Sequence, residues 1–552
     1  EMTEALITGR NADVIKTRAR KAMEQQSERT KQHAEVFTPL WIVQKMNDHA
    51  DEVWFGYPNA LFKDGNPTET VNFPEGTPWQ EYVDFRRLEI TCGEAPYLVT
   101  RYDVETGEAI PIKQRVGILD RKLRVVTENA LSESEWLKWA YRALEATYGY
   151  EFQGDNVLIA RVNLLMTFEE HLRARWNRKP TASEYFRAAN IIAWNIWQMD
   201  GLAGTIPYCK AEESKQLSMF EWLELEERIR EAADTQPHCQ IYNWRAREPL
   251  EYLSLQQGRN EKMKFDYIIG NPPYQDETLG DNATYAPPIY HLFLDEAYKI
   301  ADRVELIHPA RFLFNAGSTP KDWNKKMLSD EHLKVLYYEQ NSSKVFSNTD
   351  IKGGVAITYR DETENFGAIE TFTALDELNN IMRKVYHFAG FSSFSSIVIT
   401  RTAYRLTKKM HDDNPSAVNQ LSNGHPYDMS TNIFDRLPQI FFAMKPNDEY
   451  DYIQILGREE NKRVYKYIRR EYVNNVANLE KYKVFVPKAN GSGALGEVLT
   501  TPLIGQPLIG HTESFISIGC FDRQEEADAC YKYICTKFAR CLLGVLKVTQ
   551  DN

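Results

Sequence analysis

A short apolar segment that ends at two consecutive prolines constrains the fold of this chain more than any other feature. Residues 265–270, FDYIIG, have the composition of a buried strand, and Asn271-Pro272-Pro273-Tyr274 follow directly. Neither proline can donate a backbone hydrogen bond, and the residue before a proline favours an extended backbone. We therefore expect the strand to end here and to present polar groups from its tip.

These groups suit the methylation of an exocyclic amine. An aromatic amino group is a poor nucleophile because its lone pair is delocalised into the ring, so two acceptors must hold its N–H bonds and draw the nitrogen toward sp3 geometry. The side-chain carbonyl of Asn271 and the main-chain carbonyl of Pro272 can serve as these acceptors, and Tyr274 offers a flat face for stacking a base. From the residues alone, the alternative is an ordinary Asn-Pro turn.

The stretch FDYIIGNPPYQ resembles the catalytic motif of amino-methyltransferases that use S-adenosylmethionine. Its Asn-Pro-Pro-Tyr form is typical of DNA adenine-N6 methyltransferases, and it also occurs in protein glutamine methyltransferases. The segment KYKVFVPKANGSG and the helical segment near the C-terminus extend the resemblance to Eco57I-like restriction-modification methylases, from about His33 onward. The resemblance implies that Asn271, Pro272, Pro273 and Tyr274 are catalytic and act on a flipped base.

Residues Phe37, Thr38 and Pro39 match a Phe-Thr-Pro motif that, in this family, contributes to the pocket for the methionine part of the cofactor. The residues themselves predict a helix entry, with Thr38 as the N-cap and Pro39 at the first helical position. A helix N-terminus can receive a carboxylate. A plain helix cap is the alternative.

Residues 88–90 form a strand candidate, and Thr91, Cys92 and Gly93 follow it at the position of the family's cofactor loop. The family usually has a second glycine where this chain has Ala95, which is followed by Pro96. We therefore expect a stiffer loop than the glycine-rich version. The departure also leaves open a catalytically inert DNA-binding defence component.

Two acidic residues follow the next strand candidates. Glu151 corresponds to the family's acid at the tip of the second strand, where a carboxylate can bind both ribose hydroxyls. Asp155 is a second candidate and has the alternative role of a helix N-cap. Residues 189–202 are interpreted as an apolar strand closing on Asp200, which corresponds to the acid beside the adenine of the cofactor.

Phe346 lies before the strand candidate 355–359 and corresponds to an aromatic residue that covers the second face of the extruded base in the family. Tyr274 and Phe346 are thus expected to stack on either side of the target base. A core phenylalanine is the alternative.

Alternating strand and helix patterns predict an α/β fold with a doubly wound, mostly parallel sheet, as in Rossmann-like S-adenosylmethionine-dependent methyltransferases. We expect an N-terminal helical segment at 1–32 and a methyltransferase domain at 33–372 with an insertion at 203–264. The alternation is lost over 373–552, which we interpret as an α+β target-recognition domain that binds DNA.

The net charge of −12 is unusual for a nucleic-acid enzyme, although a cleft needs only a local excess of positive charge. The segment NKRVYKYIRREY, residues 461–472, mixes tyrosines with basic residues. A solvated helix face is one interpretation of this pattern. The other is DNA binding through Lys462, Arg463, Lys466, Arg469 and Arg470.

The remaining expectations concern partners and compartment. No stretch approaches the roughly 20 apolar residues of a membrane span, the charged N-terminal stretch is unlike a signal peptide, and seven dispersed cysteines fit a reducing compartment, so a cytoplasmic protein is expected. Double-stranded DNA is the expected substrate, with a possible restriction endonuclease partner and no metal. A protein glutamine N5-methyltransferase remains the alternative enzyme.

Overall fold

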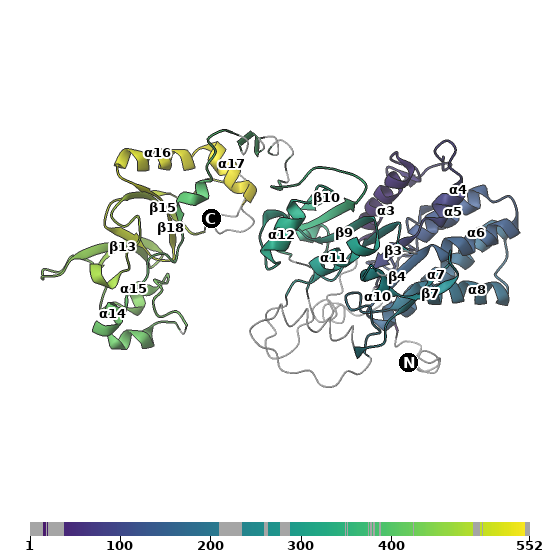
Figure 1. Ribbon diagram of the computed structural model, residues 1–552, viewed down its shortest axis with the longest axis horizontal. Helices are drawn as coiled ribbons and strands as arrows, with labels where there is room; N and C mark the ends of the chain where they lie inside the picture. The colour runs from purple at the N-terminus through teal and green to yellow at the C-terminus, as the bar shows by residue number, and fades with distance from the viewer. Residues whose placement is uncertain are drawn as a thin grey trace. The chain divides into compact units, whose positions relative to one another are not determined.

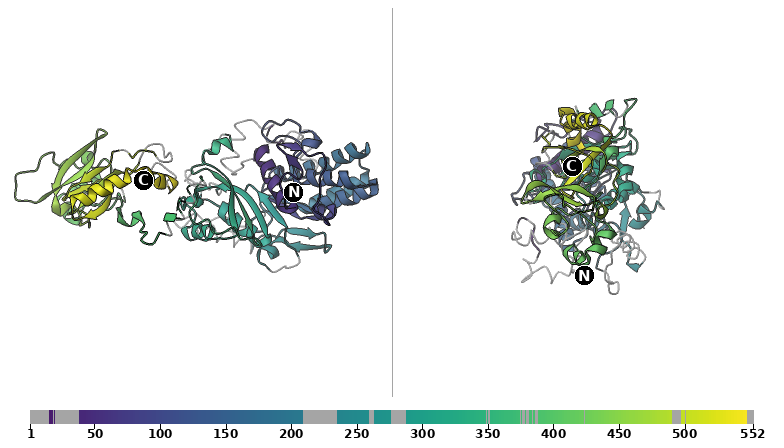
Figure 2. Two further views of the ribbon diagram at one scale, coloured as in Figure 1. Left: turned by 90° about the horizontal axis from the view of Figure 1, so that it is seen from above. Right: turned by 90° about the vertical axis from the view of Figure 1, so that its left-hand side faces the viewer.

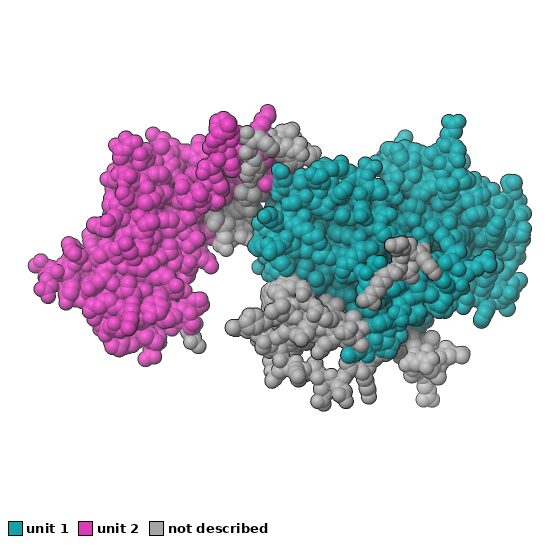
Figure 3. All heavy atoms as spheres, in the orientation of Figure 1, with its two compact units in different colours: residues 1–370 teal, residues 371–552 magenta. Residues whose placement is uncertain are grey.

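The chain divides into two compact units, Glu1–Glu370 and Thr371–Asn552 (Figure 3). The sequence predicted the domain boundary at residue 372. The computed structural model describes the following residues: 15–17, 19, 38–208, 235–258, 263–275, 287–347, 349, 351–373, 375, 378, 381–382, 384–385, 388–422, 424–489, 497–499 and 501–546. Most of the predicted helical segment 1–32, and residues 209–234 of the insertion, therefore lie outside the described residues.

Unit 1 is built on a seven-stranded sheet in the order β10-β11-β9-β8-β3-β4-β5 (Figure 1). Neighbouring strands from β5 to β9 run parallel, while β11 is antiparallel to both β9 and β10. The predicted α/β fold with a mostly parallel sheet is thus confirmed. The strands are β3 (Arg87–Ile90), β4 (Thr147–Glu151), β5 (Ile196–Gln198), β8 (Tyr267–Gly270), β9 (Arg303–Pro309), β10 (Leu333–Glu339) and β11 (Val355–Asp361).

The order of these strands fixes where a ligand can bind. The chain starts the sheet at β3, adds β4 and β5 on one side, and then adds β8 and β9 on the other. Loops after β3 and β8 therefore leave the sheet in opposite directions and open a crevice at the carboxyl ends of these two strands. Every residue of β3, β4 and β8 is buried, as expected for central parallel strands.

Helices α4 to α8 pack against one another and gather at one end of unit 1, drawn in blue and violet (Figures 1 and 2). Helix α11 packs on β9. The helices are α3 (Leu40–Phe55), α4 (Trp79–Asp84), α5 (Ile118–Asn129), α6 (Glu133–Glu145), α7 (Gly154–Trp176), α8 (Ala182–Asn195), α10 (Tyr252–Gln256), α11 (Tyr290–Ile300) and α12 (Lys321–Leu328). Two short hairpins complete the unit: β1 (Phe62–Lys63) with β2 (Asn66–Pro67), and β6 (Gln240–Asn243) with β7 (Glu248–Glu251).

The predicted strand at 189–202 is wrong for most of its length. Helix α8 starts at a capping box on Thr181 and continues to Asn195, so only Ile196–Gln198 form a strand. The apolar residues Ala188, Ile191 and Ile192 are the buried face of this helix, with the spacing of helical neighbours. A short apolar run does not distinguish a buried helix end from a strand.

Unit 2 mixes helices with two mostly antiparallel sheets. A four-stranded sheet has the order β12-β18-β15-β16 and a three-stranded sheet the order β14-β13-β17. The strands are β12 (Val398–Ile399), β13 (Tyr452–Glu459), β14 (Lys462–Arg469), β15 (Tyr482–Pro487), β16 (Leu503–Gly505), β17 (Ile509–His511) and β18 (Phe515–Phe521), and the helices are α14 (Lys408–Asp413), α15 (Ile433–Arg436), α16 (Gln524–Ile534) and α17 (Lys537–Leu546). Residues 462–469 therefore form a strand, so the interpretation of this basic segment as a helix face is wrong.

None of the helices in the described parts of the chain combines the length and the hydropathy that are needed to cross a membrane.

Candidate active site

The Asn-Pro-Pro-Tyr motif follows β8 directly and lies beside the predicted cofactor loop. Gly270, the last residue of β8, is paired with Ile90, the last residue of β3, so Asn271 and Thr91 leave the sheet side by side. The Thr91 hydroxyl donates to the main-chain carbonyl of Asn271 at 3.0 Å and to that of Ile90 at 2.8 Å. The two loops are thus bonded to each other at the carboxyl edge of the sheet.

The close approach of these two strands depends on Gly270. A Cβ atom at this position would lie 2.6 Å from the carbonyl oxygen of Ile90, which is far inside van der Waals contact. Only glycine lets the motif leave the sheet this close to the loop after β3.

The start of α3 brings Thr38 to the motif, although not as predicted. Pro39 is the N-cap, because its backbone is not helical and its carbonyl accepts from the N–H groups of Ile42 and Val43. Thr38 makes no cap, and its hydroxyl oxygen accepts a hydrogen bond of 3.3 Å from Nδ2 of Asn271 instead. Phe37 lies outside the described residues.

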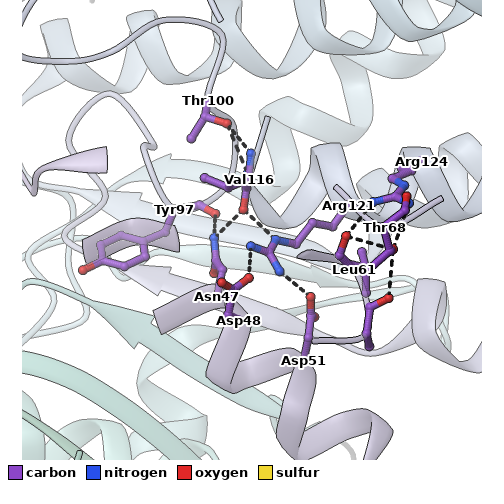
Figure 4. Close-up of polar contacts among 12 residues, drawn as sticks. Asn47, Asp48, Asp51, Leu61, Thr68, Tyr97, Thr100, Val116, Arg121 and Arg124 are labelled. Atoms are coloured by element: carbon purple, nitrogen blue, oxygen red, sulfur yellow. Dashed lines mark hydrogen bonds and ion pairs between the residues drawn. The ribbon is translucent and has the colours of Figure 1, made fainter. Parts of the chain in front are cut away.

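Buried polar contacts hold α3 in place, and the sequence patterns gave no sign of them (Figure 4). Nδ2 of Asn47 donates to the carbonyls of Tyr97 and Val116 at 3.0 and 2.9 Å. Arg121 donates to Asp51 at 2.6 Å. Burial acts to raise the pKa of Asp51, yet the guanidinium groups of Arg121 and a second arginine outweigh it and hold that pKa below its ordinary value. Helix α3 is therefore tied to the chain that follows the cofactor loop.

The loop after β3 uses the left-handed backbone region three times within five residues. The φ angles are +48° at Thr91, +54° at Gly93 and +67° at Ala95. This conformation costs a residue other than glycine about 1–2 kcal/mol. Ala95 thus keeps the backbone of a glycine, and hydrogen bonds such as Ala95 N–H to the Cys92 carbonyl at 2.7 Å hold it there. Burial raises the pKa of the Cys92 thiol well above its usual value, so this side chain stays neutral.

Glu151, the last residue of β4, connects two of the loops at this edge. One carboxylate oxygen accepts from the Gly93 N–H at 2.8 Å, and the other accepts from the Gln153 N–H at 3.1 Å. Gln153 is the N-cap of α7, which places Asp155 in the first turn of the helix and makes its predicted N-cap role wrong. Glu151 is therefore positioned at the tip of the second strand, as the resemblance implied.

Glu89 in β3 is a second buried carboxyl group that the sequence analysis missed. Its Oε2 accepts from the Leu98 N–H at 3.1 Å. Burial raises the pKa of Glu89 well above its usual value, and the nearby charge of Glu151 adds to this effect. An acidic residue between Leu88 and Ile90 was an ambiguous signal in the sequence. Through this hydrogen bond to Leu98, Glu89 holds the turn that follows the cofactor loop.

Asp200 lies next to Glu151 along the same sheet edge. The Met199 N–H donates to the Glu151 carbonyl at 2.9 Å, which continues the pairing of β4 and β5 by one residue. Oδ1 of Asp200 accepts from the N–H groups of Leu202 and Ala203 at 3.0 and 3.1 Å. The carboxylate therefore shapes the turn that follows β5.

The aromatic pair expected around a target base has a different geometry. Rings of Tyr274 and Phe346 contact each other edge to face, with centroids 6.2 Å apart and an angle of 66° between the planes. Phe346 is 2% exposed and packs in the core. Burial raises the pKa of Tyr274, while a hydrogen bond with Asn271 opposes the shift. The two rings do not form parallel faces in this structure, so a base would have to separate them.

The ends of segment 276–286 are held together beside the motif. Gln275 and Pro288 form an antiparallel bridge, and the Ile289 N–H donates to the Tyr274 carbonyl at 3.2 Å. Pro272 is buried, whereas Pro273 is partly exposed. The chain therefore leaves the motif and returns to it at one point.

The basic residues predicted to bind DNA lie on β14 or just after it in unit 2, and four of them contact different partners. Lys462 is exposed. Lys466 forms an ion pair with Glu459, and Arg463 donates to the Thr501 carbonyl at 2.7 Å. The Arg469 guanidinium lies over the Tyr450 ring, at 3.4 Å from its centroid, and Arg470 donates to the Val473 carbonyl at 2.9 Å.

Part of the chain that carries the predicted site residues matches a known family model. Residues 145–346 match the model of the Eco57I restriction-modification methylase family. This range contains Glu151, Asp200, the Asn-Pro-Pro-Tyr motif and Phe346, so the resemblance to that family is confirmed for this part of the chain. An uncharacterized adenine-specific methylase of Mycoplasma pneumoniae is 30% identical over 95 residues, which cover 17% of this chain and 22% of that protein.

Solved structures with a similar chain course include several restriction-modification enzymes. The Type ISP enzyme LlaGI, a nuclease-deletion mutant in complex with a DNA substrate mimic, is 13% identical with a TM-score of 0.41, over 94% of this chain and 45% of that one. The DrdV–DNA complex is 12% identical with a TM-score of 0.36, over 95% of this chain and 55% of that one. This chain thus spans about half the length of either structure.

Proposed function

We propose that this chain is a site-specific DNA methyltransferase that transfers a methyl group from S-adenosylmethionine to N6 of adenine, as the modification component of a restriction-modification system. The observation that carries the proposal is the position of Asn271. Its main-chain carbonyl accepts a hydrogen bond from Thr91 of the candidate cofactor loop, and its side-chain nitrogen donates one to Thr38, just before α3. The acceptor for the target amine and the candidate cofactor residues therefore share one crevice.

The residues at this edge fit S-adenosylmethionine. A buried carboxylate at the tip of the second strand suits the ribose hydroxyls, and Glu151 has that position. Asp200 lies one strand further, where an acceptor can bind the adenine amino group. Thr38 and Pro39, together with the backbone of Thr91, Cys92 and Gly93, would hold the remaining parts. When bound, this cofactor supplies an electrophilic methyl group.

The chain's own contribution is to bind and orient the target amine. The side-chain carbonyl of Asn271 and the main-chain carbonyl of Pro272 would accept the two N6–H bonds of a flipped adenine, and Tyr274 would stack on the ring. Both acceptors also stabilise the positive charge that develops at N6 during transfer. A tyrosine phenol is neutral near pH 7, and burial raises the pKa of Tyr274 further. Rate enhancement then comes mainly from orientation.

Sequence recognition would reside in unit 2. We assign phosphate contacts to the basic residues around β14, with Lys462 as the most exposed of them. Contacts of this kind position a protein on DNA, and contacts with base edges select the site. A restriction endonuclease partner would complete the system.

The test is to incubate the purified protein with tritiated S-adenosylmethionine and unmodified bacterial genomic DNA, and then to digest the DNA and chromatograph the nucleosides. Label in N6-methyladenine is the expected result. Asn271→Ala should lose this label while it binds the cofactor with an affinity near that of the wild type. Label in a protein acceptor would instead identify a glutamine methyltransferase. The absence of cofactor binding would identify an inert DNA-binding component.

A further inference from the structure

We propose that Thr38 is a positioning residue that sets the orientation of the Asn271 amide, a role that rests on the proposed function of this site. Thr38 and Asn271 are 233 residues apart in the chain, and Nδ2 of Asn271 lies 3.3 Å from the Thr38 hydroxyl oxygen. Thr38 is 2% exposed, so its hydroxyl is largely withdrawn from water. The resemblance assigned this residue only to the cofactor pocket.

The direction of the hydrogen bond between Thr38 and Asn271 follows from which atoms face each other and from what a hydroxyl can donate and accept. A threonine hydroxyl has one proton to donate and two lone pairs. The Tyr97 hydroxyl donates its own proton to Sδ of Met46 at 3.0 Å. Burial raises the pKa of Tyr97 well above its usual value, and a hydrogen bond with Thr38 opposes this shift. The Thr38 oxygen accepts from Asn271, because the amide nitrogen Nδ2 is the atom that faces it.

This arrangement selects one of the two possible orientations of the amide. The NH2 group of Asn271 faces the Thr38 oxygen and donates to it, and donation to Tyr97 by the Thr38 hydroxyl would leave only this orientation for a hydrogen bond between Thr38 and Asn271. The side-chain carbonyl of Asn271 is the amide atom that does not face the Thr38 hydroxyl, which leaves it as the acceptor for a target amine.

The anchor of Thr38 is rigid. Thr38 immediately precedes α3, and Asn47 and Asp51 of this helix are bonded to the chain after the cofactor loop. Both carbonyls that receive Asn47 belong to that chain segment, at Tyr97 and Val116 (Figure 4). A shift of the Thr38 hydroxyl would therefore require α3 or the chain after the cofactor loop to move.

A kinetic test separates this role from simple cofactor binding. Thr38→Val keeps the shape of the side chain and removes the hydroxyl, and Thr38→Ser keeps the hydroxyl. We expect Thr38→Val to reduce the single-turnover rate at saturating cofactor and DNA about ten-fold, the effect of one hydrogen bond, with a cofactor Kd within about three-fold of wild type. Thr38→Ser should restore the rate to within about three-fold. Weaker cofactor binding with an unchanged rate at saturation would overturn the proposal.

Thr127→Val is the matched control, because the Thr127 hydroxyl also accepts one side-chain N–H, that of Trp136 at 3.0 Å. Thr127 is in α5, outside the crevice formed by the loops after β3 and β8. This variant should lose stability and keep the single-turnover rate of the wild type. An equal loss of rate in both valine variants would show that Thr38 acts only through stability.

A double-mutant cycle on unfolding tests the bond without any methyl transfer. The unfolding constant is measured for Thr38→Val, Asn271→Ala and the double variant. We expect the effect of the double variant to differ by about five-fold from the product of the two single effects. Additive effects would overturn the link between the two residues. If the wild type methylates no DNA while the cycle shows coupling, the proposed function fails and the Thr38–Asn271 link is supported. An inert wild type with additive effects would refute both.

Discussion

Replacing Gly270 by alanine perturbs the point where β8 and β3 approach most closely. The added Cβ would lie 2.6 Å from the main-chain oxygen of Ile90 and 2.8 Å from its Cγ1 atom. A main-chain oxygen in a paired strand cannot rotate away, so the strands must separate. Forced overpacking costs about 1–3 kcal/mol, and we expect the upper end, about 3 kcal/mol, because the clash is with backbone.

Gly149→Ala in β4 is the matched control. The three atoms nearest to its Cβ are the ends of side chains, each at 3.2 Å, and side chains of this kind can yield. An entropic gain of about 0.4–1 kcal/mol from the stiffer unfolded chain offsets part of the crowding. We therefore expect Gly149→Ala to change stability by less than about 1 kcal/mol.

The assay is urea unfolding followed by tryptophan fluorescence. All 11 tryptophans lie before residue 371, so the signal reports on unit 1 alone. Gly270→Ala should shift the midpoint to a lower urea concentration by about 1–3 M, given a slope of about 1–3 kcal/mol/M. Equal midpoints for Gly270→Ala and Gly149→Ala would refute the argument that close backbone contact requires glycine after the motif strand.

Three further variants test other parts of the structure. Ala95→Gly should be less destabilising than Ala140→Gly in α6 by about 1–2 kcal/mol in urea unfolding, because it relieves a left-handed alanine while both changes remove one buried methyl group; equal losses would contradict this. Asp51→Asn should destabilise by about 3–5 kcal/mol at pH 7. Because the pKa of Asp51 is lowered in the folded protein, its carboxylate stabilises the fold above the ordinary pKa of 3.8, and this stability is lost as the pH falls through the pKa of the folded state. The difference in unfolding free energy between wild type and Asp51→Asn should therefore decrease in acid. A constant difference down to pH 2 would argue against this. Lys462→Ala should reduce the slope of log DNA affinity against log salt by about one, whereas Lys466→Ala, whose ammonium is paired within unit 2, should change it less; equal slopes for the two variants would argue against this assignment.

The sequence was most informative where function depends on strand order. Asn271, Thr91, Glu151 and Asp200 could be predicted to lie together, because each lies at or just after the end of a strand and parallel strands bring their carboxyl ends to one edge. The structure places β8, β3, β4 and β5 side by side in this order in the sheet. This part of the site required only motif order and the alternation of strands and helices.

Other features depend on contacts that no local pattern contains. Thr38 looked like a helix cap, and its contact with Asn271 exists only because Asn47 and Asp51 fix where α3 lies. Glu89 gave an ambiguous signal, since one acid in a short apolar run fits an exposed strand end as well as a buried carboxyl group. The alternation of basic residues and tyrosines around Tyr465 is compatible with both helix and strand periodicity, and only pairing with β13 decides between them.

The bridge between Gln275 and Pro288 joins the chain on the two sides of segment 276–286, so the position of the motif does not depend on how long that segment is. Because the Tyr274 carbonyl also receives the Ile289 N–H, insertions or deletions inside 276–286 leave the two anchor points in place. This part of the gene is therefore a natural site for grafting. Segments of other lengths could be exchanged there, while the residues proposed to hold the amine remain those of the parent chain.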